Sequence, residues 1–201
     1  MAHTAKTKTG LTWQRSLPYI LLVGGLIGLC ASFALTYDKI HVLENPAYQP
    51  GCNINPVLSC GSVMKTQQAS LLGVPNTVFG LMAFSMLIML SLILLSGAVL
   101  QRWLWRAAQA AASAGVLFMH YLFFEAVFRI HAICPWCFAV WMVTIIIFFS
   151  VTVYNLREGN LGSSRIGNFV SRYSNDIIVL WYIGIFLTLL TKFWYYWKTL
   201  L

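Results

Sequence analysis

Charged residues are scarce in this chain of 201 residues: they make up 9% of it, and Asp and Glu together number only 5. An ordinary soluble domain carries about 25% charged residues, so this composition excludes that class. Apolar residues make up 59% of the chain, and its mean hydropathy is +0.75. The sequence therefore predicts an all-α membrane protein with several spans.

The charges that are present are mostly basic, and the formal net charge is +8. A nucleic-acid-binding surface would gather Lys and Arg with aromatic residues on one polar face. Here the basic residues flank the hydrophobic runs instead, and they are most frequent in segments 1–16 (with Lys6, Lys8 and Arg15), 101–106 and 155–175. The positive-inside rule places these segments, and with them the N-terminus, in the cytoplasm.

Five hydrophobic runs are long enough to cross a bilayer core of about 30 Å, which takes about 20 residues of helix. Their predicted limits are Leu17–Tyr37, Thr77–Leu100, Ala107–Arg129, Cys134–Tyr154 and Ile177–Trp197. The first run exceeds the core of a signal peptide, about 7–15 residues, and no small-residue cleavage site follows it, so it is predicted to be a retained helix. Short connections make the second, third and fourth runs antiparallel neighbours.

The predicted organisation has four parts. They are a cytoplasmic tail (1–16), a four-helix domain (17–154) with an outer loop (38–76), a cytoplasmic linker (155–175) and a fifth membrane helix (176–201). Pro and Gly punctuate the outer loop, in which a helix is predicted over Pro56–Leu72 with its apolar side along the membrane surface. A loop of this length with two cysteines indicates a function.

The cysteines carry the chemistry. Cys134 and Cys137 form a CxxC pair at the start of the fourth run, where the partial positive charge of a helix N-terminus favours the thiolate of the leading sulfur. Cys52 and Cys60 form a second pair in the outer loop. The orientation puts all four on the outer face, where disulfides persist. Two such pairs predict a relay that passes electrons through mixed disulfides. Cys30 is predicted to be a small buried residue without a role.

The cysteines could instead bind a metal, attach a haem or form structural disulfides. A zinc site is disfavoured because Cys52 and Cys60 are too far apart for the usual ligand spacing. Covalent haem is excluded because Phe138 stands where a histidine would follow the CxxC. A DsbB-type enzyme would carry its CxxC in the first outer loop, whereas the CxxC of this chain follows the third hydrophobic run. A non-enzymatic transporter or scaffold with two structural disulfides remains as the alternative.

The loop cysteines, the following segment Gly61–Gly80 with its turn Gly73-Val74-Pro75-Asn76, and the CxxC together resemble prokaryotic members of the vitamin K epoxide reductase family. The resemblance implies a four-helix bundle that surrounds a quinone and lies in a bacterial plasma membrane. The quinone would be ubiquinone or menaquinone. It also implies a separate DsbA-like thioredoxin-fold partner, since the chain stops at Leu201 without a fused domain of that kind. The implied function is a thiol:quinone oxidoreductase that supports disulfide bond formation. Reduction of vitamin K quinone or its epoxide is left open.

The resemblance also assigns residue roles. Cys137 would face the quinone, Cys134 would exchange with the loop, and the pair of Cys52 and Cys60 would meet the partner. Asn76 would donate a hydrogen bond to a quinone carbonyl, where a neutral amide stabilises the charge that develops; its other reading is a helix cap. The remaining residues implied to contact the quinone are Thr66, Trp141, Phe79 and Phe84, with Trp141 standing where vertebrate members have tyrosine.

Three ionisable residues near the CxxC have open roles. His120 and Glu125 lie within the third run, where ionisable groups are functional candidates. Glu125 is spaced to pair with Arg129 at i, i+4. His131 precedes the CxxC and, when protonated, could lower the pKa of the Cys134 thiol.

Overall fold

The computed structural model describes residues 8–71, 73–162 and 165–199; Lys6 and Leu72, which figure in the predictions above, lie outside them. The described chain is almost entirely helical, and five helices have the length and apolar composition of membrane spans. The bounds of the long helices are α1 (Lys8–Glu44), α3 (Asn76–Leu95), α4 (Arg102–Phe124), α5 (Pro135–Arg157) and α7 (Ser174–Lys192). The predicted all-α membrane bundle with five spans is confirmed.

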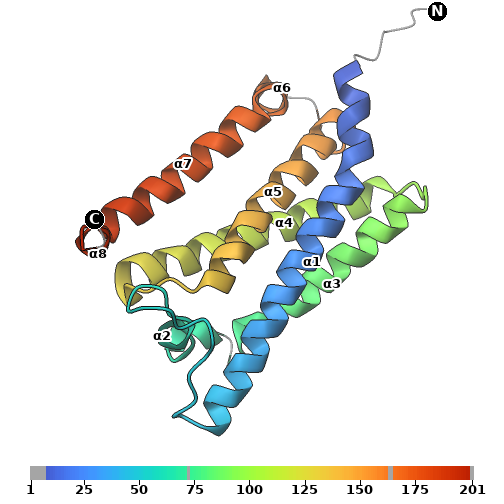
Figure 1. The fold of residues 1–201 in the computed structure, drawn as a ribbon. Helices are drawn as coiled ribbons and strands as arrows, with labels where there is room; N and C mark the ends of the chain where they lie inside the picture. Colours follow the sequence, from blue (N-terminus) through green and yellow to red (C-terminus); the bar gives the residue numbers. More distant parts are fainter. Residues whose placement is uncertain (1–7, 72, 163–164, 200–201) are drawn as a thin grey trace, which may run out of the picture.

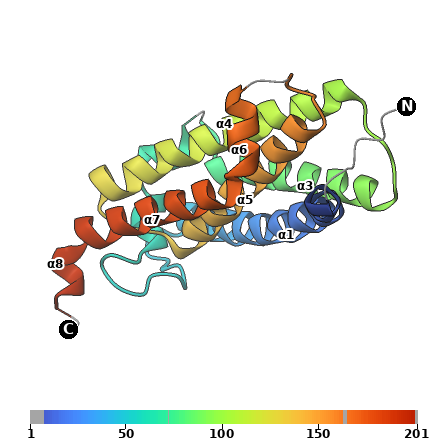
Figure 2. The same ribbon diagram turned by 90° about the horizontal axis from the view of Figure 1, so that it is seen from above.

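Helix α1 lies between α3 and α5, α4 packs on the other side of α5, and α7 lies at the edge of the bundle (Figures 1 and 2). The predicted pairing of the second and third spans is wrong in this respect, because α3 packs along α1 rather than along α4. Small residues allow that contact. A Cβ atom at Gly28 would collide with the Phe84 ring, and one at Gly80 with Ser32. In a membrane, close backbone approach of this kind supplies the packing that drives helix association.

Several bounds differ from the predictions. Helix α1 continues past Tyr37 to Glu44, since a helix does not need to end where its apolar run ends. The predicted helix over Pro56–Leu72 is two short pieces, α2 (Cys60–Met64) and the 3-10 helix η1 (Gln67–Ser70). Val57 and Met64 are buried in the protein rather than turned to the membrane surface.

The C-terminal part also differs from its prediction. The linker contains a short helix, α6 (Arg165–Arg172). The fifth span ends at Lys192, and a separate turn, α8 (Trp194–Trp197), follows it.

A single parallel β-bridge joins the outer loop to the segment before the CxxC. Ile133 donates its backbone N–H to the carbonyl of Val57 at 2.7 Å, and Ser59 donates to the carbonyl of Ile133 at 3.0 Å. Ile133 is followed directly by Cys134, and Leu58 is followed by Ser59 and then by Cys60. Because backbone hydrogen bonds fix the register of the two bridged segments, they also hold the two cysteines side by side.

A π-helical turn, η2 (Glu125–Ile130), ends the third span, and His131 leaves it with a left-handed backbone at φ 57°. The backbone N–H of Ala132 then donates to the carbonyl of Ala126 at 3.2 Å. Such turns are frequent at functional sites because they redirect the chain that follows. Here the chain turns from α4 into the bridge and then into the CxxC.

Candidate functional site

The four relay cysteines lie together at one end of the bundle. Cys52 and Cys60 form a disulfide in the outer loop, while Cys134 and Cys137 are free thiols. The Sγ atom of Cys134 lies 3.1 Å from the Sγ atom of Cys60. A free thiol thus rests against one sulfur of a closed disulfide, which is the contact that thiol–disulfide exchange requires.

Both sulfurs of this contact sit at helix starts. Cys134 is the N-cap of α5, Pro135 occupies the first helical position, and the Cys134 sulfur accepts the backbone N–H of Cys137 at 3.5 Å. Proline suits that position because its missing N–H would have no partner there. Cys60 begins α2, whose N-cap Ser59 accepts the backbone N–H of Ser62 at 3.2 Å.

The surroundings of the sulfur contact are apolar. Leu35 and Met64 pack around Cys60 and Cys134, which are 0% and 1% exposed. Cys52 and Cys137, at the two outer ends of the row of cysteines, are only half-buried. The junction between the pairs is therefore shielded, and Cys52 and Cys137 flank it.

The Cys134 thiol is the more acidic one expected of an exchanging sulfur. The hydrogen bond from Cys137 lowers the pKa of Cys134, and bonds from the backbone at Trp136 and Cys137 add to this, against the opposing effect of burial. A lowered pKa means that more of the sulfur is thiolate at neutral pH. A sulfur with a lower pKa also leaves more readily from a mixed disulfide, so Cys134 is suited to thiol–disulfide exchange.

We predict that replacing Cys137 with alanine raises the pKa of Cys134, because the largest cause of the lowered value is lost. Thiolate ultraviolet absorbance, followed as a function of pH with the loop disulfide closed, measures this. The absorbance step should move to higher pH in Cys137→Ala. A step at the same pH in both proteins would show that the helix backbone alone sets the acidity.

Of the residues implied to contact a quinone, Trp141 lies nearest in sequence to the CxxC on α5. It follows Cys137 by one helical turn and therefore shares its face. It is buried, and its ring meets Phe123 edge-on at 5.0 Å and Phe138 at 6.3 Å between centroids. Cys137 and Phe138 pack against the same apolar cluster, which gives Cys137 an aromatic wall.

The other implied quinone residues are engaged elsewhere. Asn76 donates its side-chain amide to the carbonyl of Gln68 at 2.7 Å and accepts the backbone N–H of Leu71 at 3.2 Å, so it fastens η1 and does not cap α3. Thr66 donates its hydroxyl to the carbonyl of Val63 at 2.7 Å. Phe79 is half-buried on α3, and Phe84 packs in a separate cluster with residues of α1 and α5.

The ionisable residues of the third span have structural partners. His120 accepts the indole N–H of Trp181 at its Nε2 atom, 2.9 Å away, and its Nδ1 atom lies 2.8 Å from the carbonyl of Val116. Because the indole can only donate, this is the neutral ring with its hydrogen on Nδ1. His120 therefore joins α4 to α7.

The predicted pairing of Glu125 with Arg129 is confirmed at 3.0 Å. His131 is exposed, and its Nδ1 atom lies 3.2 Å from the carbonyl of Arg129. Cys30, predicted to be buried, is exposed on α1. Hydropathy does not distinguish a helix face turned to lipid from one turned to protein, so the error has a physical cause.

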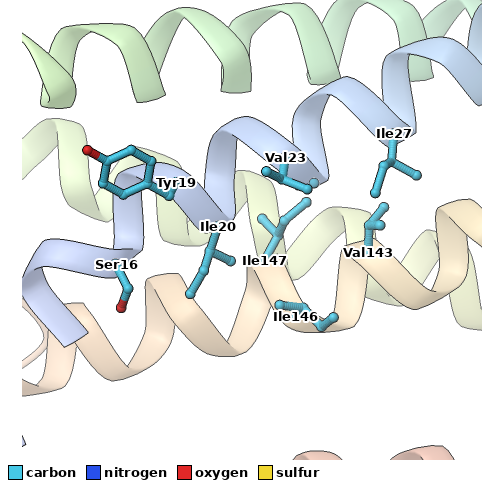
Figure 3. A pocket seen from close by; sticks show the side chains of 9 residues that line it. Ser16, Tyr19, Ile20, Val23, Ile27, Val143, Ile146 and Ile147 are labelled. Carbon is cyan, nitrogen blue, oxygen red and sulfur yellow. The ribbon is translucent and has the colours of Figure 1, made fainter. Parts of the chain in front are cut away.

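An apolar groove of about 380 Å³ lies between α1 and α5, away from the cysteines along both helices (Figure 3). Its walls include Ile20, Val23 and Ile27 of α1 and Val143 and Ile147 of α5. None of the predicted site residues lines it. Ser16 and Tyr19 also line it, and the rest of its lining is apolar. We assign the groove no part in the sulfur chemistry.

Sequence reasoning missed one residue of the site, Asp38. Helix α1 carries it into the outer region, where its Oδ2 atom lies 3.8 Å from the Sγ atom of Cys52 and its Oδ1 atom accepts the hydroxyl of Tyr48 at 2.9 Å. Acidic residues are rare in this chain, in which Asp and Glu number only 5, and this rarity was the one feature of the sequence that could have indicated a role for Asp38.

A helical membrane bundle in which two cysteine pairs touch defines a membrane thiol–disulfide oxidoreductase. The family model described as the vitamin K epoxide reductase family matches residues 19–152, a range that holds all four relay cysteines. The chain belongs to this family, as its motifs predicted. Members use quinones as electron carriers and work with thioredoxin-like partners. No curated protein matches the chain at a significant level.

Proposed function

We propose that this protein is a thiol:quinone oxidoreductase that reoxidises a separate DsbA-like thioredoxin-fold partner and so supports disulfide bond formation. Electrons pass from the partner's dithiol to the pair of Cys52 and Cys60, then to the pair of Cys134 and Cys137, and then to a membrane quinone. The observation that carries this proposal is the 3.1 Å contact between the sulfurs of Cys60 and Cys134.

The first exchange takes place at Cys52. A partner thiolate attacks its sulfur, Cys60 leaves as thiolate, and the partner's second thiol then displaces Cys52, so that the partner leaves oxidised and the loop pair reduced. The half-buried state of Cys52, compared with the full burial of Cys60, supports this choice of sulfur. Exchange at Cys60 by a protein thiol would require the loop to open.

The second exchange takes place at the sulfur contact. The Cys60 thiolate attacks Cys134 in an oxidised CxxC pair, Cys137 leaves, and Cys52 then closes the loop disulfide and releases Cys134. This leaves the loop oxidised and the CxxC pair reduced. The arrangement of sulfurs in the structure, with a closed loop disulfide beside two free thiols, corresponds to the product of this exchange.

A bound quinone would supply the two-electron acceptor, and ubiquinone and menaquinone both suit the proposal. Cys137 would face it beside Phe138 and Trp141, which provide an apolar wall that excludes water. Asn76 gives one amide hydrogen to Gln68 and keeps a second, since a side-chain amide has two. That second hydrogen would be available to a quinone carbonyl. Thr66 and Phe79 are the further contacts we propose, with Phe84 as part of the packing behind them.

We further propose the orientation in which the cysteines face the outside of a bacterial plasma membrane and the N-terminus faces the cytoplasm. Helix α2 and the start of α5, which carry Cys60 and Cys134, lie together at one end of the bundle (Figure 1). The segments 101–106 and 155–175 connect helices at the opposite end, and they hold Arg102, Arg106, Arg157, Arg165 and Arg172. In this arrangement residues 17–154 form the catalytic domain. It is preceded by a cytoplasmic segment (1–16) that includes the first turns of α1, and it is followed by a linker (155–175) and a C-terminal segment (176–201) that contains most of α7.

The test is a coupled assay with the purified wild-type protein in lipid nanodiscs. A reduced thioredoxin-fold protein serves as donor, and short-chain ubiquinone or menaquinone serves as acceptor. Quinone absorbance and free thiols are followed together, and one quinone should be consumed for each pair of thiols lost. Cys30→Ala, which leaves both pairs intact, should keep this activity. No quinone-dependent loss of thiols in the wild type would contradict the proposal and favour structural disulfides.

A further inference from the structure

One carboxylate touches the relay sulfurs without a part in the exchange described so far. Asp38 is 9% exposed on α1, and its two oxygens face two different groups of the outer loop. Its Oδ1 atom accepts the Tyr48 hydroxyl, and its Oδ2 atom lies 3.8 Å from the Sγ atom of Cys52. In the disulfide state Cys52 has no hydrogen to donate, so this is a contact only. Once the disulfide is reduced, the same geometry lets the Cys52 thiol donate to the carboxylate.

We propose that Asp38 is a catalytic residue, the base that accepts the proton of the Cys52 thiol when Cys52 closes the loop disulfide. This inference rests on the relay in the proposed function and identifies the group that drives its resolving step. The carboxylate touches a reacting sulfur directly, and general base catalysis by a placed side chain contributes about 10²–10⁴-fold in rate.

The proton of the Cys52 thiol moves to the Oδ2 atom of Asp38, and the resulting thiolate attacks the Sγ atom of Cys60 in the mixed disulfide of Cys60 with Cys134. The bond between Cys52 and Cys60 forms, the bond between Cys60 and Cys134 breaks, and the electron pair leaves on the Cys134 sulfur. The CxxC pair is thereby reduced and the loop pair oxidised. Asp38 then loses its proton to water at the outer face.

The other ionisable groups around Asp38 are Tyr48, Lys39, Cys134 and His41. The Nδ1 atom of His41 lies 3.0 Å from the carbonyl of Tyr37, and its ring packs against Tyr48 at 5.2 Å between centroids. Tyr48 is held protonated, because its hydrogen bond to Asp38 raises the pKa of its phenol. Lys39, the next residue on α1, donates its ammonium to the carbonyl of Met64 at 2.6 Å and fixes the end of α2. Cys134, at the start of α5, lies against Cys60 and is the leaving group of this step, so it does not act as the base. Tyr48 also holds the carboxylate in place, which keeps Oδ2 directed at Cys52.

The decisive variant is Asp38→Asn. The amide has the shape of the carboxylate and its oxygen still accepts the Tyr48 hydroxyl, but it does not take a proton. Oxidised protein, prepared with diamide, is mixed with dithiothreitol, quenched with acid at intervals and examined by mass spectrometry without reduction. We expect the resolving step to slow by about 10²-fold near neutral pH. The mixed disulfide of Cys60 with Cys134 should accumulate in the variant and stay below detection in the wild type.

A pH series separates a chemical role from a structural one. Without its base, closure depends on the thiolate fraction of Cys52. At pH values well below about 8.5, the ordinary pKa of a cysteine thiol, the closure rate of Asp38→Asn should therefore rise about tenfold per pH unit. The wild-type rate should change much less. Tyr48→Phe, which loosens the carboxylate but keeps it, should give a smaller loss with a wild-type profile. Glu44→Gln, an exposed carboxylate on the same helix, should behave as wild type.

Two results would overturn the role of Asp38. One is a wild-type closure rate in Asp38→Asn. The other is an equal loss, with the same pH profile, in Asp38→Asn and Tyr48→Phe, which would make the carboxylate a structural anchor. The experiment contains no quinone, so its outcome is separate from that of the proposed function. The wild-type protein could fail to reduce quinone while Asp38→Asn still accumulates the mixed disulfide. That result would contradict quinone as the electron acceptor but would support Asp38 as the base.

Discussion

Replacing Cys134 with serine is expected to abolish quinone-dependent oxidation of a thioredoxin-fold donor, with a loss of about 10³-fold or more, the scale on which removal of a nucleophile acts. Serine fills the same space at the N-cap of α5, but an oxygen does not form the mixed disulfide with Cys60. Electrons that reach the loop pair then have no sulfur through which to continue. The loss should therefore lie in transfer between the pairs.

The measurement that checks this has two parts. Donor oxidation with short-chain ubiquinone as acceptor reports the complete relay, and it should stop in Cys134→Ser. Reduction of the loop disulfide by dithiothreitol reports the first exchange alone, and it should proceed at the wild-type rate. Cys30→Ser is the matched control, because it makes the same change at an exposed cysteine of α1. Sustained turnover in Cys134→Ser would show that the loop passes electrons to Cys137 directly.

The second large effect is expected in a protein reduced to one sulfur from each pair. In Cys52→Ala/Cys137→Ala, Cys60 and Cys134 have lost their usual partners, and their sulfurs are already 3.1 Å apart. Mild oxidation with diamide should convert nearly all of this variant to the disulfide of Cys60 with Cys134. The β-bridge between Leu58 and Ile133 holds the two backbones in register. The sulfurs therefore need to move only a short way to reach the disulfide bond length of about 2.05 Å.

The matched control is Cys52→Ala/Cys134→Ala, which also keeps one cysteine from each pair. Cys137 lies one turn further into α5, and Cys134 is the residue that contacts Cys60. Oxidation should therefore give far less of the intramolecular disulfide. Non-reducing mass spectrometry of digested protein distinguishes the products. Equal yields from the two variants would mean that the loop moves freely over the start of α5.

The sequence predicted the parts of this protein that depend on local composition. Hydrophobic length identifies the five spans, because a helix must cover the bilayer core whatever its tertiary contacts are. The spacing of Cys134 and Cys137 at the start of a span predicts a reactive pair at a helix N-terminus. The pairing of Glu125 with Arg129 follows from helix geometry alone.

Other features depend on non-local contacts that no local pattern encodes. The bridge of Leu58 with Ile133 joins segments far apart in the chain through backbone hydrogen bonds, which any residue type except proline can make. Asp38 was predicted to lie in a loop because the apolar run stops at Tyr37, yet the helix continues and carries it to Cys52. The hydrogen bonds of Asn76 to the η1 segment arise in the same way, from a turn whose closure is not visible in the sequence.

The complete burial of Cys60 and Cys134 has a consequence for the cell that makes this protein. In the proposed relay, a small thiol or oxidant from the outer fluid would not reach the meeting point of the two pairs unless the outer loop moved. Electrons on their way to a quinone would therefore be kept from reacting with such solutes.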